Sequence, residues 1–365
     1  MRVSAVVAIL AALLVPAAAP GATFTDGIGA YKRGDHARAL AIFQSLAAGN
    51  DARSQFALGL MYENGEGVAQ DMRTAVQWYE KSAAQGFAKA QQNLALLYDS
   101  GTGVAADRAQ AERWFYAAAQ GGNQDALKHF SDLAERGDND ARIRLASLYL
   151  GGRGVSKSYG TAAYWFRRAA ESGDLRGVFG QAWLHDEGLG GTADPAKAVK
   201  GYEAAAAKGD RKAMYNLALM YRNGAGVVRD PARARELLLR GATAGHVRSQ
   251  VALAMMAENG EDGAEPEAAV HWYEQAALAG DAVAQNNLGV MHAQGEHAPR
   301  DELRAYVYFR AAAEGGEADA ARNADAVKAH LAAEQLAAAD EALARLQQQY
   351  AGAAPADATA QPDKP

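Results

Sequence analysis

The sequence contains no cysteine among its 365 residues and only 9 prolines. Without cysteine there is no disulfide framework, no thiolate metal site and no cysteine nucleophile. Glycine, by contrast, numbers 38, and apolar residues make up 49% of the chain. This composition favours many short helices joined by glycine turns, and it disfavours a β-sheet protein.

An excess of positive charge is also missing. The formal net charge is -6 at pH 7, whereas a general nucleic-acid binder needs a basic excess to hold phosphates. No stretch after residue 22 is apolar enough to cross a bilayer, which takes about 20 residues. We therefore expect neither a nucleic-acid partner nor stable membrane insertion.

Residues 1–22 have the pattern of a signal peptide. Met1-Arg2 gives a positive start, residues 3–15 form an apolar stretch, and small residues follow up to Ala22. An apolar stretch of this length suits the central part of a signal peptide and is too short for a spanning helix. We expect cleavage after Ala22, a mature chain that begins near Thr23, and a periplasmic or secreted location. The alternative is an uncleaved N-terminal anchor.

A motif recurs along most of the chain. Gly65-x-Gly67-Val68 is followed 36 residues later by Gly101-x-Gly103-Val104, and Tyr62 is followed by Tyr98 at the same offset. A fixed period of this length is typical of a stacked solenoid. The pattern defines seven units: 51–86, 87–122, 138–173, 174–209, 210–245, 246–280 and 281–316.

Each unit reads as two antiparallel helices. In the second unit Leu94, Leu97 and Tyr98 share one helical face, and Trp114 and Phe115 belong to a second helix with the same spacing. The glycine pair between the two helices permits positive φ angles. Aspartates such as Asp71, Asp107 and Asp194 stand where the second helix needs an N-cap.

The set Leu58-Gly59-x-x-Tyr62, Gly65-x-Gly67-Val68, Asp71 and Ala75-x-x-Trp78-Tyr79, with its copies, resembles the Sel1-like repeats of the tetratricopeptide superfamily. The resemblance implies an all-α, right-handed α-solenoid of about seven 36-residue helix-turn-helix repeats with helical caps. It also implies a scaffold or regulator that binds other proteins.

The predicted organisation has seven parts. They are a signal peptide (1–22), an N-terminal tetratricopeptide-like capping pair (23–50), repeats one and two (51–122), an extra single helix (123–137), repeats three to seven (138–316), C-terminal capping helices (317–350) and a disordered tail (351–365). The tail is expected to be disordered because its Ala, Pro and Asp residues have almost nothing to bury.

The sequence does not predict an enzyme or a cofactor. It lacks nucleophile, phosphate-loop and metalloprotease motifs, which disfavours the alternative of a cell-wall or β-lactam hydrolase. A loop cluster of His292, Glu296, His297 and Asp301 has residue types that suit zinc. Because no helical spacing fixes these residues, we interpret them as packed or loop residues and predict no metal site.

Six residues are predicted to bind a partner. In the tetratricopeptide geometry that the repeats resemble, the third, sixth and tenth positions of each unit face a concave groove. Such a groove suits an extended acidic segment of another protein; the alternative is that the aromatic side chains are core and the basic ones ordinary surface. The predicted groove residues are Arg176, Phe179, Trp183, Lys212, Tyr215 and Arg248.

These observations predict a non-catalytic, protein-binding scaffold or regulator of the bacterial envelope. The resemblance implies that the partner could belong to the machinery of the cell wall or of exopolysaccharide export. The alternative is a secreted factor that engages a host protein. A further basic group, Arg229, Arg233, Arg235 and Arg240, is interpreted as an ordinary solvated face.

Overall fold

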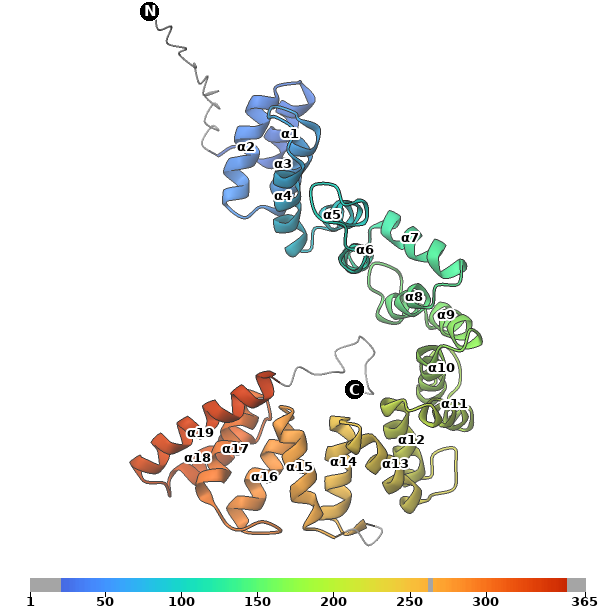
Figure 1. The fold of residues 1–365 in the computed structure, drawn as a ribbon, viewed down its shortest axis with the longest axis vertical. Helices are drawn as coiled ribbons and strands as arrows, with labels where there is room; N and C mark the ends of the chain where they lie inside the picture. Colours follow the sequence, from blue (N-terminus) through green and yellow to red (C-terminus); the bar gives the residue numbers. More distant parts are fainter. Residues whose placement is uncertain (1–20, 262–264, 353–365) are drawn as a thin grey trace, which may run out of the picture. The chain divides into compact units, whose positions relative to one another are not determined.

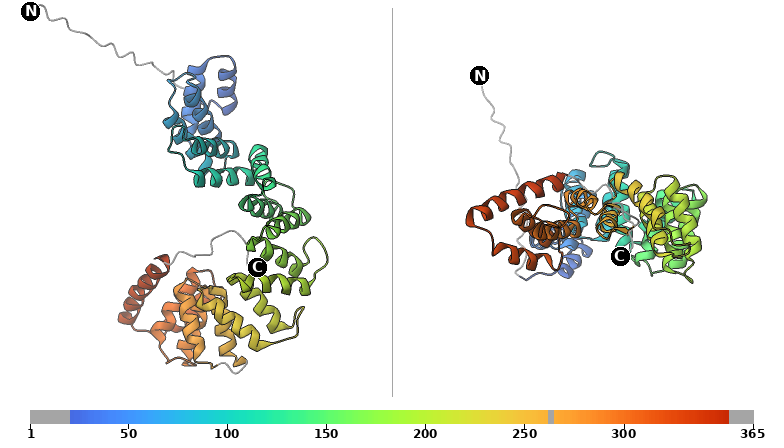
Figure 2. Two further views of the ribbon diagram at one scale, coloured as in Figure 1. Left: turned by 45° about the vertical axis from the view of Figure 1, so that its right-hand side comes forward. Right: turned by 90° about the horizontal axis from the view of Figure 1, so that it is seen from below.

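The computed structural model describes residues 21–261 and 265–352, which form nineteen helices and no strand. The chain divides into two compact units, Met1–Ser158 and Tyr159–Pro365 (Figures 1 and 2). Most of the predicted signal peptide and of the predicted tail lies outside the described residues. None of the described helices combines the length and hydropathy that a membrane-spanning helix requires. The predicted all-α solenoid of helix pairs is confirmed.

The first unit contains eight helices. Two form the N-terminal pair, four form the first two repeats, and two follow before the unit ends. They are α1 (Phe24–Lys32), α2 (His36–Ala48), α3 (Ala52–Asn64), α4 (Met72–Ala84), α5 (Ala88–Ser100), α6 (Arg108–Gln120), α7 (Gln124–Glu135) and α8 (Asn139–Gly151).

The second unit contains the other eleven, in which first and second helices of the repeats alternate from α9 to α17 (Figure 1). They are α9 (Tyr159–Glu171), α10 (Leu175–Glu187), α11 (Pro195–Ala207), α12 (Arg211–Asn223), α13 (Pro231–Thr243), α14 (Val247–Glu258), α15 (Ala268–Leu278), α16 (Ala282–Gln294), α17 (Glu302–Glu314), α18 (Ala320–Lys328) and α19 (Ala333–Gly352).

Aspartates begin the second helices, as predicted. The Asp71 carboxylate accepts hydrogen bonds from the backbone N–H groups of Arg73 and Thr74 at 3.0 and 3.2 Å. Asp194 accepts one from Lys197 at 3.0 Å. These bonds satisfy N–H groups that have no partner within the helix. The hydrogen bond from the Thr74 side chain to Asp71 also lowers the pKa of that carboxyl group.

The two glycines of each loop have different roles. The first, such as Gly101 (φ 72°), ends the first helix in the left-handed conformation. The second packs on the preceding repeat: a Cβ on Gly103 would lie 2.6 Å from the carbonyl oxygen of Met72, and one on Gly226 would lie 2.4 Å from the carbonyl carbon of Pro195. Since Met72 and Pro195 begin α4 and α11, these two loops rest on the start of the preceding second helix. We call this contact the glycine interlock.

Side chains also join consecutive repeats, through residues 14 positions apart. The buried hydroxyl of Tyr202 accepts a hydrogen bond from Asn216 at 3.2 Å and lies 3.4 Å from Asp186. Tyr79 and Tyr273 have Asn93 and Asn287 at the same offset and also bond to carboxylates. Burial, reinforced by the hydrogen bond to the Glu258 carboxylate, raises the pKa of Tyr273 well above its usual range.

In the third repeat a phenylalanine replaces this tyrosine, and the residue 14 positions later is not asparagine. Phe166 has Gly180 at the 14-residue offset, and a Cβ on Gly180 would lie 2.5 Å from the Phe166 ring. Tyr79, Tyr202 and Tyr273 thus have an asparagine at this offset that can bond to the hydroxyl, whereas Phe166 has a glycine that leaves room for its ring.

The unpaired helix α7 takes the place of a second helix. A Cβ on Gly154, from the loop after α8, would lie 1.8 Å from the Ala119 carbonyl oxygen and 2.9 Å from the Gly122 nitrogen, directly before α7. The loop therefore packs on the residues just before α7, much as other loops pack on the first residue of a second helix. In addition, Arg144 of α8 lies over the ring of Phe130 of α7, at the same 14-residue offset. Helix α7 is a half-repeat without a first helix.

The glycine interlock predicts a difference between two neighbouring loops of the second unit. Gly226→Ala should lower the free energy of unfolding by about 2 kcal/mol or more, because alanine would be strained at a φ of 69° and would also meet the backbone at Pro195. Gly191→Ala is the matched control, since no atom lies within 4 Å of its added Cβ, and it should be neutral or stabilise by up to about 1 kcal/mol. Urea unfolding of both variants checks this; equal midpoints would contradict the interlock.

Candidate partner-binding surface

The structure places the six predicted groove residues at equivalent positions of three successive first helices. Arg176, Phe179 and Trp183 belong to α10, Lys212 and Tyr215 to α12, and Arg248 to α14. All three helices are in the second unit. Spacings of three and seven residues put the side chains of one helix on a single face.

Phe179 is a core residue and not part of a binding floor. Its side chain is only 3% exposed, and its ring centroid lies 5.6 Å from that of Tyr202 in α11. The sixth position of this repeat therefore faces the second helix of the same repeat. For Phe179 this is the alternative that the sequence left open, because aromatic residues at helical spacing look alike whether they are core or surface.

Trp183 and Tyr215 are half-buried instead. Both pack on the core cluster that contains Phe179 and Leu217. The Tyr215 ring lies 5.5 Å from that of His246, at 60° to it. The indole Nε1 of Trp183 is buried and has no hydrogen-bond partner.

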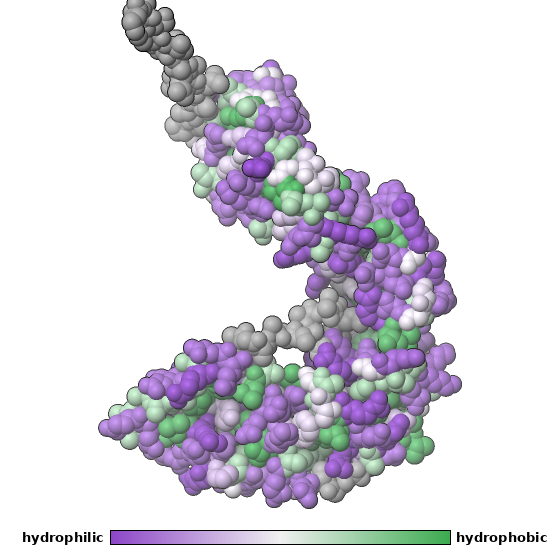
Figure 3. Space-filling model, viewed as in Figure 1, coloured by the Kyte–Doolittle hydropathy of each residue, from purple (hydrophilic) through white to green (hydrophobic). Residues whose placement is uncertain are grey.

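An apolar row continues from Trp183 along the unit. The tenth positions of the following repeats are Leu219, Met255 and Val290, and each is half-buried. Figure 3 shows apolar residues as small separate patches among polar ones on the face it presents. Because each side chain of the row is half-buried, the row offers narrow apolar contacts and not a broad apolar interface.

Each of the three basic residues is the second residue of its helix, as Arg53 and Lys89 are in α3 and α5. The helix dipole disfavours a cation in the first turn by about 0.3–1 kcal/mol. Arg176 lies beside the N-cap Asp174, with 2.6 Å between Nη2 and Oδ2. Burial of Asp174 acts to raise its pKa, but the hydrogen bonds from Arg176 outweigh it and lower that pKa.

Lys212 is half-buried and Arg248 is exposed, one repeat apart. At both positions the helix dipole opposes a positive charge. Their neighbour Arg211 donates a hydrogen bond to the Ala244 carbonyl oxygen at 2.9 Å, across the turn that precedes α14. The first turns of α10, α12 and α14 thus carry a row of cations, which we call the basic row: Arg176, Lys212 and Arg248.

The second basic group is mostly used in local contacts. Arg229 donates to the Arg222 carbonyl oxygen at 3.0 Å, and Arg233 bonds to Glu236 at 2.5 Å. Arg240 reaches the Ala206 carbonyl oxygen at 3.4 Å. These bonds agree with the interpretation of an ordinary surface face.

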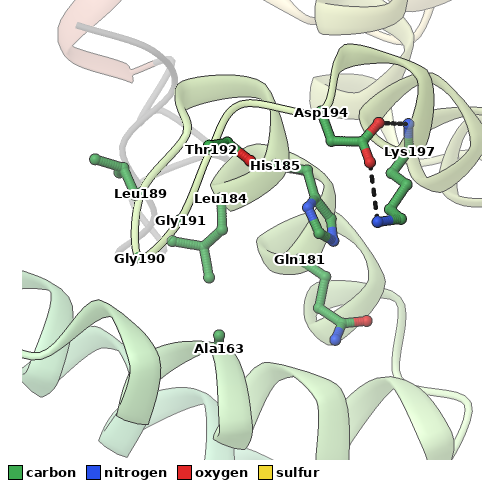
Figure 4. A pocket seen from close by; sticks show the side chains of 10 residues that line it. All are labelled: Ala163, Gln181, Leu184, His185, Leu189, Gly190, Gly191, Thr192, Asp194 and Lys197. Atoms are coloured by element: carbon green, nitrogen blue, oxygen red, sulfur yellow. Dashed lines mark hydrogen bonds and ion pairs between the residues drawn. The ribbon is translucent and has the colours of Figure 1, made fainter.

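A hollow of about 300 Å³ lies beside the loop of the fourth repeat (Figure 4). Its lining includes Ala163, Leu184 and His185, while the Asp194 carboxylate at its edge is bonded to Lys197. Gly191 stands here where Val227 packs on the core in the next repeat. The missing valine side chain contributes to the hollow. The change from valine to glycine is visible in the sequence.

The predicted loop cluster is held by packing. His292 is 3% exposed, its Nδ1 lies 3.1 Å from the Pro299 carbonyl oxygen, and its ring stacks on Tyr308. His297 is exposed and has a φ of 60°. Within residues 21–261 and 265–352, no group of three or more His, Asp or Glu side chains is arranged to hold a metal ion.

Two truncations on α10 should differ in their effect on stability. Phe179→Ala is expected to cost about 3–5 kcal/mol of unfolding free energy, as for other core aromatics. Trp183→Ala should cost less, about 1–2 kcal/mol, because part of its side chain is already in water. Chemical denaturation of both variants measures the difference. If Trp183→Ala cost as much as Phe179→Ala, Trp183 would be a core residue and not a surface one.

The chain is similar to solved structures of repeat proteins. No curated protein matches the chain. A solved protective antigen of uropathogenic Escherichia coli with an SLR fold is 28% identical, with 91% of this chain and 72% of that chain covered and a TM-score of 0.49. A Sel1 repeat protein from Oxalobacter formigenes is 33% identical, with 69% of this chain and 96% of that chain covered and a TM-score of 0.40.

The family model of the Sel1 repeat matches seven segments of the chain. They are residues 52–87, 88–123, 139–174, 180–210, 211–246, 247–281 and 282–317. Seven repeats are thus found; their bounds lie one residue after those read in the sequence, except that the fourth match begins at residue 180. Sel1 repeat proteins generally serve as protein-interaction scaffolds and are typically not enzymes. The chain belongs to the Sel1 repeat family.

Proposed function

We propose that the protein is an exported scaffold or regulator of the bacterial envelope that binds an extended, acidic segment of a partner protein. The binding surface is the basic row together with the half-buried apolar residues Trp183, Tyr215 and Leu219. The observation that carries the proposal is the position of the basic row. Lys212 and Arg248 recur at the one turn of the helix where a cation opposes the dipole.

The cations and the apolar residues affect different rates of binding. Exposed cations attract an acidic segment over about one Debye length, roughly 8 Å at physiological salt, and so raise the association rate. Trp183 and Tyr215 supply the contact area that determines how long the complex lasts. Because the apolar patches are small, binding by either element alone would be weak.

The envelope location rests on the signal-peptide pattern of residues 1–22. A periplasmic scaffold meets the soluble parts of membrane proteins and the machinery that builds the cell wall or exports polysaccharide. An acidic, extended segment of such a protein has the chemistry that the basic row recognises.

The test is affinity capture with chemical cross-linking from envelope extracts, followed by binding kinetics with the captured partner. Lys212→Ala/Arg248→Ala should slow association about tenfold at low salt, and the difference should fade at high salt. Arg233→Ala/Arg235→Ala is the matched control: it removes the same charge from the second helix α13 and should leave the association rate within about twofold.

Three outcomes would contradict the proposal. One is an equal slowing by the two charge variants, since that would reflect net charge alone. Another is an unchanged association rate for Lys212→Ala/Arg248→Ala. The third is recovery of the protein only from the cytoplasm with Met1 intact, which would remove the envelope part.

A further inference from the structure

The fourth repeat departs from the other six at one core position of its first helix. The other repeats have a buried leucine there: Leu58, Leu94, Leu145, Leu217, Leu253 and Leu288. The fourth repeat has Gln181, whose side chain is half-buried. A polar side chain in place of a core leucine loses apolar contacts, and its amide is costly to bury unless it is hydrogen-bonded. At this position the fourth repeat therefore gives up core packing.

Two more replacements in the same repeat adjoin the same space. His185 stands where four other repeats have a tyrosine: Tyr62, Tyr98, Tyr149 and Tyr221. Gly191 stands where four have a valine: Val68, Val104, Val155 and Val227. Gln181, His185 and Gly191 all line the hollow of about 300 Å³ beside this loop. The hollow thus lies where other repeats have a leucine, a tyrosine and a valine.

The lining of the hollow combines apolar side chains with an amide that has no partner. Leu184 of α10 and Ala163 of α9 provide apolar surface, while Gln181 and His185 lie one turn apart on α10 (Figure 4). Within residues 21–261 and 265–352, no group forms a hydrogen bond with the side-chain amide of Gln181. This amide therefore has N–H donors and a carbonyl acceptor that a ligand can use.

The hollow is separate from the basic row and is already formed. Gln181 and Trp183 are two residues apart on α10, which is about 200° around a helix, so their side chains point to opposite sides. A Cβ on Gly190 would lie 3.1 Å from the Cβ of Tyr159, the first residue of α9. The loop that carries Gly191 therefore packs on the preceding repeat, and this contact sets the edge of the hollow.

We propose that the hollow is a second binding site, which takes one aliphatic side chain of an extended peptide from a partner protein. The side chain lies against Leu184 and Ala163, and the Gln181 amide bonds to the adjoining peptide group. An amide side chain suits a peptide group because both carry an N–H donor and a C=O acceptor. A purely apolar ligand would leave the amide unbonded, and a charged side chain would lose its hydration against Leu184. The site goes beyond the proposed function, because its ligand requires no acidic residue.

The probes are the tripeptides acetyl-Ala-X-Ala-amide, in which X is leucine, alanine or aspartate. Each is titrated onto the full chain, and binding is followed by ligand-observed nuclear magnetic resonance. The leucine peptide should bind with a Kd of about 1 mM, and the other two at least tenfold more weakly, because they lack the apolar carbons that the hollow buries. N-methylation of the leucine and of the alanine after it removes two N–H donors and should weaken binding about fivefold.

Restoring the residues of the other repeats fills the hollow from within. Gln181→Leu and Gly191→Val should each weaken binding of the leucine peptide at least tenfold. Gly191 does not have a positive φ, and no atom lies within 4 Å of an added Cβ, so the backbone accepts valine. The urea midpoint of both variants should stay the same or rise, because the added carbons pack on apolar surface. Loss of binding in a variant that is at least as stable then excludes unfolding as the cause.

Lys212→Ala/Arg248→Ala is the control, since it changes the basic row alone and should leave the affinity for the leucine peptide within about twofold. Four results would overturn the inference. They are no binding of the leucine peptide at 10 mM, equal binding of the leucine and alanine peptides, unchanged affinity in both filled variants, and a lower urea midpoint in either of them. Equal affinity for the N-methylated peptide would overturn the role of Gln181, because the hollow would then select the side chain alone.

Discussion

The contact between a loop glycine and the start of the preceding second helix determines how the repeats are arranged. At Gly103 and Gly226 the loop backbone approaches the neighbouring backbone so closely that no Cβ fits. Van der Waals contacts of this kind cannot slide without opening a gap or a clash. Where it occurs, the contact therefore fixes a repeat on the one before it, and equivalent residues fall into rows.

These rows of equivalent residues determine where the surface is positively charged and where it is apolar. A single lysine at a helix start is an ordinary surface residue, whereas Lys212 and Arg248 lie one repeat apart on stacked helices. The half-buried residues Trp183 and Leu219 form a second row in the same way. A solenoid of this kind presents the same chemistry at regular intervals, which suits a ligand that is itself extended.

Much of the fold could be predicted because its signals are local. Asp71 and Asp194 cap helices, and the glycine pairs mark loops, so helix pairs follow from a few residues at fixed spacing. The core position of Phe179 could not be predicted, since that requires knowing which side of α10 faces Tyr202. The pairing of Tyr202 with Asn216 and of Phe166 with Gly180 spans two repeats and becomes meaningful only when the helices are seen in contact.

The account predicts that recognition follows the spacing of the repeats. The most direct measurement is the binding of synthetic alanine–proline peptides with two aspartates three, six or nine residues apart. Lys212 and Arg248 lie one repeat apart, so the affinity should depend on the spacing of the two aspartates and should be lost in Lys212→Ala/Arg248→Ala. Affinity that depends on the number of aspartates but not on their spacing would contradict it.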